Sequence, residues 1–388
     1  MHTLRRKSYN KNMKTFIKIF LFLAAGAGLY WFAFHQTPQE KEFAKTLTAA
    51  RAGDAQAMER AGDFYLAGEG TKPSPAQALE WYKNAVQKEN YNAAWKLAQL
   101  YIAGTQTPQN LDEAAGYLQL AAQAGAAPAQ NELGRFYEEG LGGIAAHGGQ
   151  GFFWRFTAAQ QGDKTAQQYL EQAQKDQPEL FERAAAFFTD LKSAQNGNVE
   201  AQLRLAQAYE AGTVVLPNEK ETERWLLAAW EENQSPQAGY ELAQIYLDKN
   251  HPLYDEEKGI SLLGQLAQLP YAPAQHALGE RAYKEEPANY EDAFAWFSNA
   301  AAAGYAPAQY MTGFMLMQGQ GMTKSVDLSI KFFRDAAEQN YASAQYVLGQ
   351  IYYKGLGVPR DKKAGKMWLE KAAENGSVPA QALLETLN

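Results

Sequence analysis

The sequence predicts an all-α fold, a solenoid of about nine helix-turn-helix repeats of ~36 residues with capping helices. The chain has 388 residues, more than twice the ~150 of a usual domain, so it holds several domains or one long array. With 46% hydrophobic residues and 15 prolines, it is neither disordered nor collagen-like. A short Ala-Gln-x-x-Leu-Gly-like string recurs along the chain at nearly constant spacing, which favours the array.

The first 39 residues have the composition of a membrane segment and its flank. They contain six basic residues and no acidic ones, so the formal net charge of −7 divides into +6 here and −13 over residues 40–388. Residues 15–34 are twenty residues with a single charge, enough to cross a hydrocarbon core of ~30 Å. Because basic flanks stay in the cytoplasm, we expect a cytoplasmic tail (1–14), a transmembrane segment in the bacterial inner membrane (15–35) and a periplasmic body (36–388).

A cleaved signal peptide is the alternative for this segment. Met13 would then be the start, Phe16–Leu23 the apolar core and Ala25-Gly26-Ala27 the cleavage site. Cleavage after Ala27 would leave the apolar string GLYWFAF at the new N-terminus, so an uncleaved segment is preferred, and a soluble periplasmic form stays open. The absence of cysteine excludes a lipoprotein anchor, disulfides and thiolate metal sites.

Each recurring string begins at a motif alanine and predicts a first helix, helix A. Alanine, leucine and aromatic residues recur there at helical spacing, as in SAQYVLGQIYYKGLG from Ser343. The motif alanines lie 34 to 37 residues apart: Ala57, Ala93, Ala129, Ala166, Ala201, Ala238, Ala274, Ala308, Ala344 and Ala380. In six repeats a glycine stands eleven residues after the alanine, where we expect it to end helix A in the left-handed conformation: Gly68, Gly104, Gly140, Gly212, Gly319 and Gly355.

A second helix, helix B, is predicted between that glycine and the next motif alanine. A pair of small residues, mostly Ala-Ala, stands eight and seven residues before the alanine, and a further glycine, four residues before it, ends the helix. Small side chains let neighbouring helices approach closely, and a large residue about twelve before the alanine is expected to fill the remaining gap. These large residues are Tyr117, Trp154, Leu262, Trp296, Phe332 and Trp368.

The two ends and the middle of the array depart from this pattern. Residues 39–53 are predicted as a lone helix B and the stretch around Ala380 as a lone helix A, which cap the array. The repeats that start at Ala166, Ala238 and Ala274 lack the glycine that ends helix A, so regularity is expected to be weakest over 166–290. The string GLGGIAAHGGQG at 140–151 contains six glycines and is expected to protrude or to move.

These repeats resemble the Sel1-like repeat family, a branch of the tetratricopeptide-like α-solenoids. The resemblance covers residues 49–388 and rests on the ten copies of the alanine string. It implies right-handed superhelical stacking, a concave groove lined largely by helix A, and work as an adaptor or scaffold for other proteins. Some cysteine-rich members have been associated with penicillin binding, but their inter-repeat disulfides are absent from this chain.

No motif predicts catalysis, a metal or a cofactor. Of the five histidines, His147, His251 and His276 lie in the body and have no metal-ligand spacing. The string GQGMTKS at 319–325 lacks the glycine directly before the lysine that a phosphate loop needs. The acidic body argues against nucleic acid as a partner. Adjacent glutamates are interpreted as solvated faces, because neighbouring residues point apart on a helix: Glu138-Glu139, Glu256-Glu257 and Glu285-Glu286.

A binding surface is therefore the remaining candidate for function. If helix A lines the groove, the residue two positions after each motif alanine faces it or its edge: Glu59, Trp95, Asn131, Gln168, Leu203, Tyr240, His276, Tyr310 and Tyr346. The last four are aromatic, and with Phe314 and Tyr353 they form a predicted ladder that suits an extended peptide or a helix, because tyrosine gives a large contact area at low entropic cost. The alternative is that these rings pack partly against the next repeat.

Together these features predict a membrane-anchored, periplasm-facing scaffold that positions or assembles other envelope proteins, for example of a secretion or cell-wall machine. Since the body is acidic, a basic or neutral partner segment is expected. Peptidoglycan or glycan binding through exposed aromatic rings is an alternative. A cell-wall or β-lactam hydrolase is a further alternative, for which the sequence offers no nucleophile.

Overall fold

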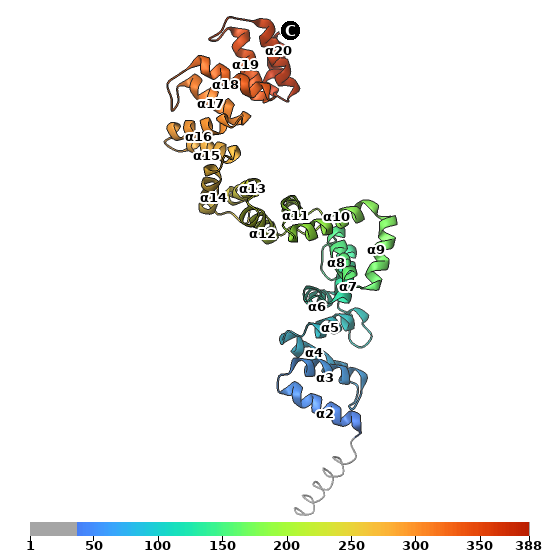
Figure 1. Ribbon diagram of the computed structural model, residues 1–388. Coiled ribbons are helices and arrows are strands. Elements are labelled where there is room, and N and C mark those ends of the chain that lie inside the picture. Colours follow the sequence, from blue (N-terminus) through green and yellow to red (C-terminus); the bar gives the residue numbers. More distant parts are fainter. Residues whose placement is uncertain (1–36, 388) are drawn as a thin grey trace, which may run out of the picture. The chain divides into compact units, whose positions relative to one another are not determined.

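The computed structural model describes residues 37–387, which contain twenty α-helices, one π-helical turn and no β-strand (Figure 1). The all-α prediction is therefore confirmed for this part of the chain. The predicted tail (1–14) and transmembrane segment (15–35) lie outside the described residues. None of the described helices is both long enough and apolar enough to span a membrane.

The chain divides into two compact units, and the boundary lies inside helix α10 (Pro178–Gln195). The first unit runs to Phe188 and also includes Thr213–Leu216, and the second comprises Thr189–Gly212 and the residues from Pro217 onward. The first unit contains α2 (Pro38–Arg51), α3 (Ala55–Ala67), α4 (Pro75–Gln87), α5 (Tyr91–Ala103), α6 (Leu111–Gln123), α7 (Ala127–Glu139), α8 (Gly148–Gln160) and α9 (Lys164–Asp176).

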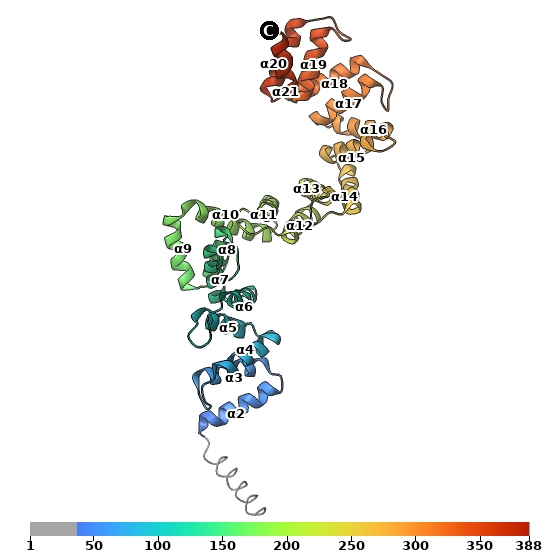
Figure 2. The same ribbon diagram turned by 180° about the vertical axis from the view of Figure 1, so that it is seen from behind.

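The second unit contains the remaining helices. They are α11 (Val199–Ala211), α12 (Glu219–Leu227) with the π-helical turn Ala228–Glu232, α13 (Pro236–Leu247), α14 (Glu256–Gln268), α15 (Ala272–Lys284), α16 (Tyr290–Ala302), α17 (Ala306–Gln318), α18 (Val326–Glu338), α19 (Ala342–Lys354), α20 (Lys362–Glu374) and α21 (Val378–Leu387). Within each unit nearly every helix packs against the next along the chain (Figures 1 and 2). Between the lone helices α2 and α21, the described helices follow one another as nine predicted pairs, α3–α4 to α19–α20, and all of these pairs except α9–α10 pack closely against each other.

The predicted glycines end the helices for the expected reason. Gly68, the first of the six glycines that follow helix A, has φ of +73°, and the other five have φ between +63° and +76°. The repeats from Ala166, Ala238 and Ala274 end helix A without a left-handed residue, since Gln177, Asp248 and Glu285 have negative φ. The departure from the regular turn over 166–290 is thus confirmed at these three helix ends.

The Ala-Gln pair of the motif has two separate roles. All motif alanines except Ala57 are 0% exposed, so they lie in the core. The following glutamine is also buried in several repeats, and it joins one repeat to the next. Gln345, which is 0% exposed, donates from Nε2 to the carbonyl oxygen of Ala337 at 3.0 Å and accepts from Asn375 Nδ2 at 2.9 Å. Gln130 makes the same two bonds, with Ala122 and Gln161.

Replacing Gln345 with methionine is expected to lower the free energy of unfolding by about 1–3 kcal/mol, because the Ala337 carbonyl loses its donor in a buried place and the half-buried bond from Asn375 is lost as well. Methionine keeps the side-chain length, so packing changes little. Gln381 is the matched control: it donates to the Ala373 carbonyl from an exposed position, so Gln381→Met should cost much less. Urea unfolding of both variants measures the difference, and equal costs would contradict this role of Gln345.

The residue that fills the gap inside each repeat is not the one predicted. Of the six large residues twelve before a motif alanine, only Leu262 is buried, and the other five are half-buried. The buried residue is the next one, eleven before the alanine, because one step along a helix turns the side chain by 100°. These residues are Tyr82, Leu118, Arg155, Leu263, Phe297, Phe333 and Leu369, all at most 7% exposed.

We call the buried residue eleven before the motif alanine the filler. A glycine of helix A leaves room for it. This glycine stands five residues after the motif alanine, as Gly279 and Gly313 do. A Cβ atom on Gly279 would lie 2.8 Å from the ring of Phe297, and one on Gly313 would lie 3.1 Å from the ring of Phe333. Where this position is alanine, as at Ala98 and Ala243, the filler is leucine. Glycine also faces a leucine, in the pair Gly349 and Leu369, so glycine is found with fillers of either kind, whereas alanine is found here with leucine.

The turn between helix A and helix B often contains a second glycine, which packs against helix B of the preceding repeat. A Cβ atom on Gly321 would meet the carbonyl oxygen of Tyr290 and the Cβ of Phe294, at the start of α16. One on Gly357 would meet Val326 at the start of α18. Each such turn thus covers the first residues of the preceding helix B.

The glycine-rich segment 140–151 does not protrude, so that prediction was wrong. Its second half forms the first turn of α8, where a Cβ atom on Gly149 would meet the backbone of Val214. Gln150 Oε1 accepts a hydrogen bond from the backbone N–H of Leu216 at 2.9 Å. Gly151 lies against Gly134 of α7, whose carbonyl oxygen would be 2.9 Å from an added Cβ. The glycines here allow close packing rather than a free loop.

Differences in repeat length are absorbed outside helix A. The repeat from Ala201 has 37 residues, and its extra residue lies in helix B, where the π-helical turn Ala228–Glu232 follows α12. The repeat from Ala129 also has 37, but its extra residue lengthens the turn between α7 and α8. The repeat from Ala274 has 34 residues and a shorter turn between α15 and α16.

Candidate functional site

The aromatic residues predicted as a ladder all lie half-buried in the second unit. Tyr240 is on α13, His276 on α15, Tyr310 on α17 and Tyr346 on α19. Each stands two residues after a motif alanine, at the same place in its repeat. A half-buried ring keeps one side for packing and another for solvent, so partner binding by these residues stays a prediction.

Three of these four rings contact a tyrosine of the next repeat. The ring centroids are 5.8 Å apart for Tyr240 and Tyr271, 5.4 Å for His276 and Tyr305, and 5.6 Å for Tyr310 and Tyr341. The three partners are the N-cap residues of α15, α17 and α19. We call this set the tyrosine strip: Tyr240, Tyr271, His276, Tyr305, Tyr310 and Tyr341.

The phenol groups of the tyrosine strip lie near enough to influence one another. Burial raises the pKa of Tyr240 above its ordinary value, and the phenols of Tyr305 and Tyr271 raise it further. Burial likewise raises the pKa of Tyr305, with smaller contributions from Tyr341 and Glu280. Tyr240 and Tyr305 are therefore neutral hydrogen-bonding groups at pH 7.

His276 is part of this surface as a neutral ring. Burial is the largest cause that lowers its pKa, and Lys284 lowers it further, against the opposing charge of Glu280. Its ring lies 5.2 Å from that of Phe297, between the filler of its own repeat and Tyr305. His276 is thus uncharged at neutral pH and acts as an aromatic member of the strip.

The other three predicted residues do not join the strip. Phe314 packs against the core cluster of Ile330, Phe333 and their neighbours. The amine of Lys362, at the start of α20, lies over the Tyr353 ring, 5.8 Å from the ring centroid. Tyr346 packs on Leu369 and Ala380, and the next repeat has Ser377 where the others have tyrosine.

Three members of the strip were not predicted from the sequence: Tyr271, Tyr305 and Tyr341. A signal for them exists, since each precedes a motif alanine by three residues, in the strings YAPAQ, YAPAQ and YASAQ. A recurring tyrosine at a helix N-cap has no capping function there, because none of the three makes a side-chain cap hydrogen bond. Its repetition points to a surface role.

Of the predicted series in the first unit, Glu59 and Asn131 are hydrogen-bonded to neighbouring side chains, Trp95 packs on the core and Gln168 is exposed. Glu59 Oε1 lies 2.7 Å from Lys96 Nζ, which also contacts Asp63, and the hydroxyl of Tyr82 donates to Asp63 at 2.7 Å. These carboxylates border a surface cavity of about 760 Å³ between α3 and α5. One lysine of the second repeat thus bridges two carboxylates of the first, so the cluster links the two repeats and keeps one net negative charge.

A second polar cluster in the first unit contains a buried arginine. Arg155, 7% exposed, occupies the filler position of its repeat. Its Nε and Nη2 each lie 2.9 Å from one carboxylate oxygen of Glu138, and Nη1 donates to Asn131. The guanidinium lies 3.7 Å from the ring centroid of Tyr169. The interpretation of Glu138 as solvated was therefore wrong, since this carboxylate is enclosed with its partner.

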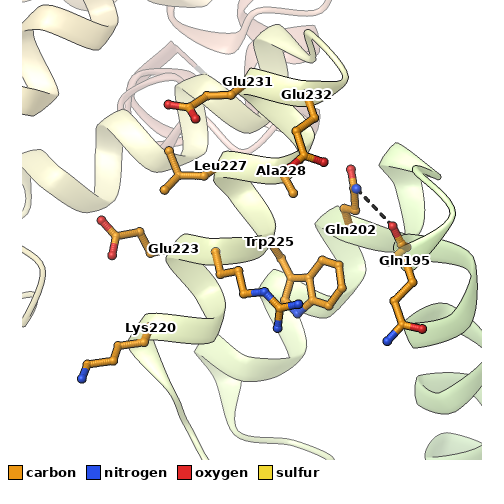
Figure 3. A pocket seen from close by; sticks show the side chains of 11 residues that line it. Gln195, Gln202, Lys220, Glu223, Trp225, Leu227, Ala228, Glu231 and Glu232 are labelled. Carbon is orange, nitrogen blue, oxygen red and sulfur yellow. Dashed lines mark hydrogen bonds between the residues drawn. The ribbon is translucent and has the colours of Figure 1, made fainter.

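A cavity of about 520 Å³ in the second unit lies beside the π-helical turn (Figure 3). Figure 3 shows Trp225 near Gln195 and Gln202, with Glu231 and Glu232 on the turn above it. The guanidinium of Arg224 lies 4.8 Å from the Trp225 ring centroid. Glu223 also lines the cavity, and its carboxylate accepts a hydrogen bond from the hydroxyl of Tyr246 at 2.5 Å. No residue that lines this cavity is a serine, threonine, cysteine or histidine.

The described residues offer no grouped ligands for a metal ion, since no three His, Cys, Asp or Glu side chains come together among them. His147 is the N-cap of α8, where Nδ1 accepts from the backbone N–H of Gln150 at 2.9 Å. His251 Nε2 lies 3.1 Å from Glu210 Oε1. Gly319 and Gly321 of the phosphate-loop-like string are turn glycines with φ of +75° and +69°.

Comparison with known proteins identifies the repeats. Seven segments match the family described as Sel1 repeat: residues 55–90, 92–125, 127–163, 199–233, 272–305, 306–341 and 342–377. Together they cover more than half of the chain. The two unmatched stretches between them, 164–198 and 234–271, contain two of the three repeats that lack the glycine after helix A.

Individual relatives share parts of this sequence. Chitin synthase regulatory factor 3 of Schizosaccharomyces pombe is 31% identical over 136 residues, which is 34% of this chain and only 14% of that protein. A protective antigen of uropathogenic Escherichia coli is 26% identical with a TM-score of 0.46, over 93% of this chain and 78% of that one. A Sel1 repeat protein of Oxalobacter formigenes is 23% identical with a TM-score of 0.46, over 89% and 90% of the two chains.

Proposed function

Because this chain belongs to the Sel1 repeat family, we propose that it is a non-catalytic adaptor that binds other proteins of the cell envelope through the tyrosine strip. Sel1 repeat proteins generally mediate protein–protein interactions. The observation that carries the proposal is the row of six aromatic residues, repeated at one place in consecutive repeats. Such a row presents regularly spaced contacts to a partner segment.

The chemistry of the strip supports a protein segment as the partner. Its rings pair edge-on or tilted, with interplanar angles of 61°, 76° and 55°, so they offer ring edges and hydroxyls. Tyrosines in this setting give contact area and hydrogen bonds at low entropic cost, as at many protein interfaces. Glu280 lies close enough to influence Tyr240, Tyr305 and His276. A basic or neutral segment with apolar residues fits this surface.

The placement in the cell is the second part of the proposal. The basic flank before the apolar stretch 19–34 supports a transmembrane segment at 15–35 in the bacterial inner membrane, with the repeats in the periplasm. Tethering would hold the adaptor beside membrane-bound machines, such as those of secretion or cell-wall synthesis. The partner is then an envelope protein.

In-cell photo-crosslinking tests both parts. Benzoylphenylalanine at Tyr305 or Tyr341 is expected to capture one envelope protein, identified by mass spectrometry, whereas the same probe at Tyr91 or Tyr254 should not. Those control tyrosines are 38% and 39% exposed and lie outside the strip. The paired change Tyr305→Ala with Tyr341→Ala should reduce binding of the identified partner by about tenfold or more. The thermal midpoint of this variant reports whether the fold persists.

Three outcomes would contradict the proposal. Equal capture at the control tyrosines would show that the strip has no special role. Recovery of a cytoplasmic protein would contradict the periplasmic placement. Recovery of cell-wall fragments in place of a protein would favour glycan binding.

A further inference from the structure

The end of α19, the turn after it and most of α20 carry a charge opposite to that of the body. Residues 353–371 contain six basic and two acidic residues, so their formal charge is +4, whereas residues 40–388 together carry −13. The rest of the body therefore carries −17. The six basic residues are Lys354, Arg360, Lys362, Lys363, Lys366 and Lys371. A local excess of this kind attracts an acidic partner.

Part of this basic surface is hollowed. A cavity of about 680 Å³ lies between the first turns of α20 and the end of α21. Lys362, Lys363 and Lys366 line it together with the apolar side chains of Met367 and Leu387. Met367 is 42% exposed, which is high for a large apolar residue. Asp361 and Glu370 line the cavity as well, so its lining combines three cations and two carboxylates with an apolar floor, and the Asp361 carboxylate is engaged in capping α20.

The corresponding place in earlier repeats is built differently. At the start of α18, Val326 and Ile330 lie under Gly357 of the following turn. At the start of α16, the following turn places Gly321 against Tyr290 and Phe294.

On α20 the two positions that correspond to this apolar pair are Lys362 and Lys366. Lysines at these positions favour ion pairs with carboxylates over packing against the apolar side of a further repeat turn.

We propose that this cavity binds an acidic amphipathic segment of a partner protein. Carboxylates of that segment would pair with Lys362 and Lys363, while an apolar side chain would rest on Met367 and Leu387. The concave shape and the apolar floor favour a protein segment over a flat anionic membrane. The tyrosine strip suits a basic or neutral segment, so this site takes a different partner and does not depend on the strip.

Fluorescence anisotropy with the full-length protein tests the site. The probe is a short labelled peptide with glutamates on one helical face and leucine and phenylalanine on the other. The control peptide has lysine in place of each glutamate. Only the acidic peptide is expected to bind. The pair Lys362→Glu and Lys363→Glu should weaken binding by about tenfold or more, and so should Met367→Asp. The control pair Lys331→Glu and Lys371→Glu makes the same charge change on exposed lysines outside the cavity and should have less than about a twofold effect.

The result that overturns the proposal takes one of three forms. Equal weakening by both lysine pairs would mean diffuse electrostatic attraction without a site. Equal binding of the lysine peptide would remove the charge argument. Displacement of the peptide by vesicles of phosphatidylglycerol, with no effect of Met367→Asp, would identify the surface as a lipid-binding one.

Discussion

Replacing Arg155 with leucine is expected to lower the local free energy of unfolding by about 3–5 kcal/mol. The substitution removes the cation that pairs with the Glu138 carboxylate, whose side chain is 17% exposed, and leaves that charge largely enclosed by protein. The loss occurs even though leucine stands at the same place in other repeats, as Leu118 and Leu369. Hydrogen exchange of the α7 and α8 amides measures it, because the lost ion pair joins these two helices.

Two further variants separate the buried ion pair from other effects. Arg135 on α7 pairs with Glu132 and Glu139, but its side chain is 32% exposed, so Arg135→Leu should cost about 1 kcal/mol or less. The double change Arg155→Leu with Glu138→Leu should recover most of the loss, since an apolar pair of similar size replaces the ion pair. If Arg155→Leu were as mild as Arg135→Leu, the enclosed pair would have no structural importance.

Phe297→Ala is expected to destabilise α15 and α16 by about 3–5 kcal/mol. Phe297 is 0% exposed and fills the space against Gly279, so its removal leaves a cavity that the backbone cannot close. The adjacent Trp296 is larger but half-buried, and Trp296→Ala should cost less. Amide hydrogen exchange of the two helices gives both values. A larger loss for Trp296→Ala would restore that residue as the filler.

A double-mutant cycle tests the size match between helix A and helix B. Gly279→Ala alone should destabilise by about 1–3 kcal/mol, because the new methyl group would lie 2.8 Å from ring atoms of Phe297. Adding Phe297→Leu should relieve this contact and recreate the combination found at Ala98 with Leu118. The double variant is expected to lose less than the sum of the two single changes. Simple additivity would mean that the two positions do not interact.

Repetition is the reason that the sequence predicts so much of the fold. Ten motif alanines at a spacing of 34 to 37 residues place the helix pairs, and left-handed glycines place most of the helix ends. The two lone helices at either end follow from the same pattern. These features depend on local conformation and on helical period, which a sequence states directly.

The details of packing depend on rotation about each helix axis, and there the sequence misleads. Trp296 and Phe297 are both large and apolar, and only the tertiary contact with Gly279 distinguishes the buried one. Glycines at 140–151 resemble a free loop until helix α8 and the backbone of Val214 are seen to pack on them. Arg155 occupies a core position that composition would assign to an apolar residue.

The candidate site divides in the same way. The sequence by itself determined the helical repeats, the aromatic residues two after each motif alanine, and the reversal of charge over 353–371. Only the tertiary structure decided that Tyr271, Tyr305 and Tyr341 complete the strip and that Phe314 and Tyr353 lie elsewhere. The physical reason is that helical period and charge are properties of residues along the chain, whereas a surface is made by side chains that meet across repeats.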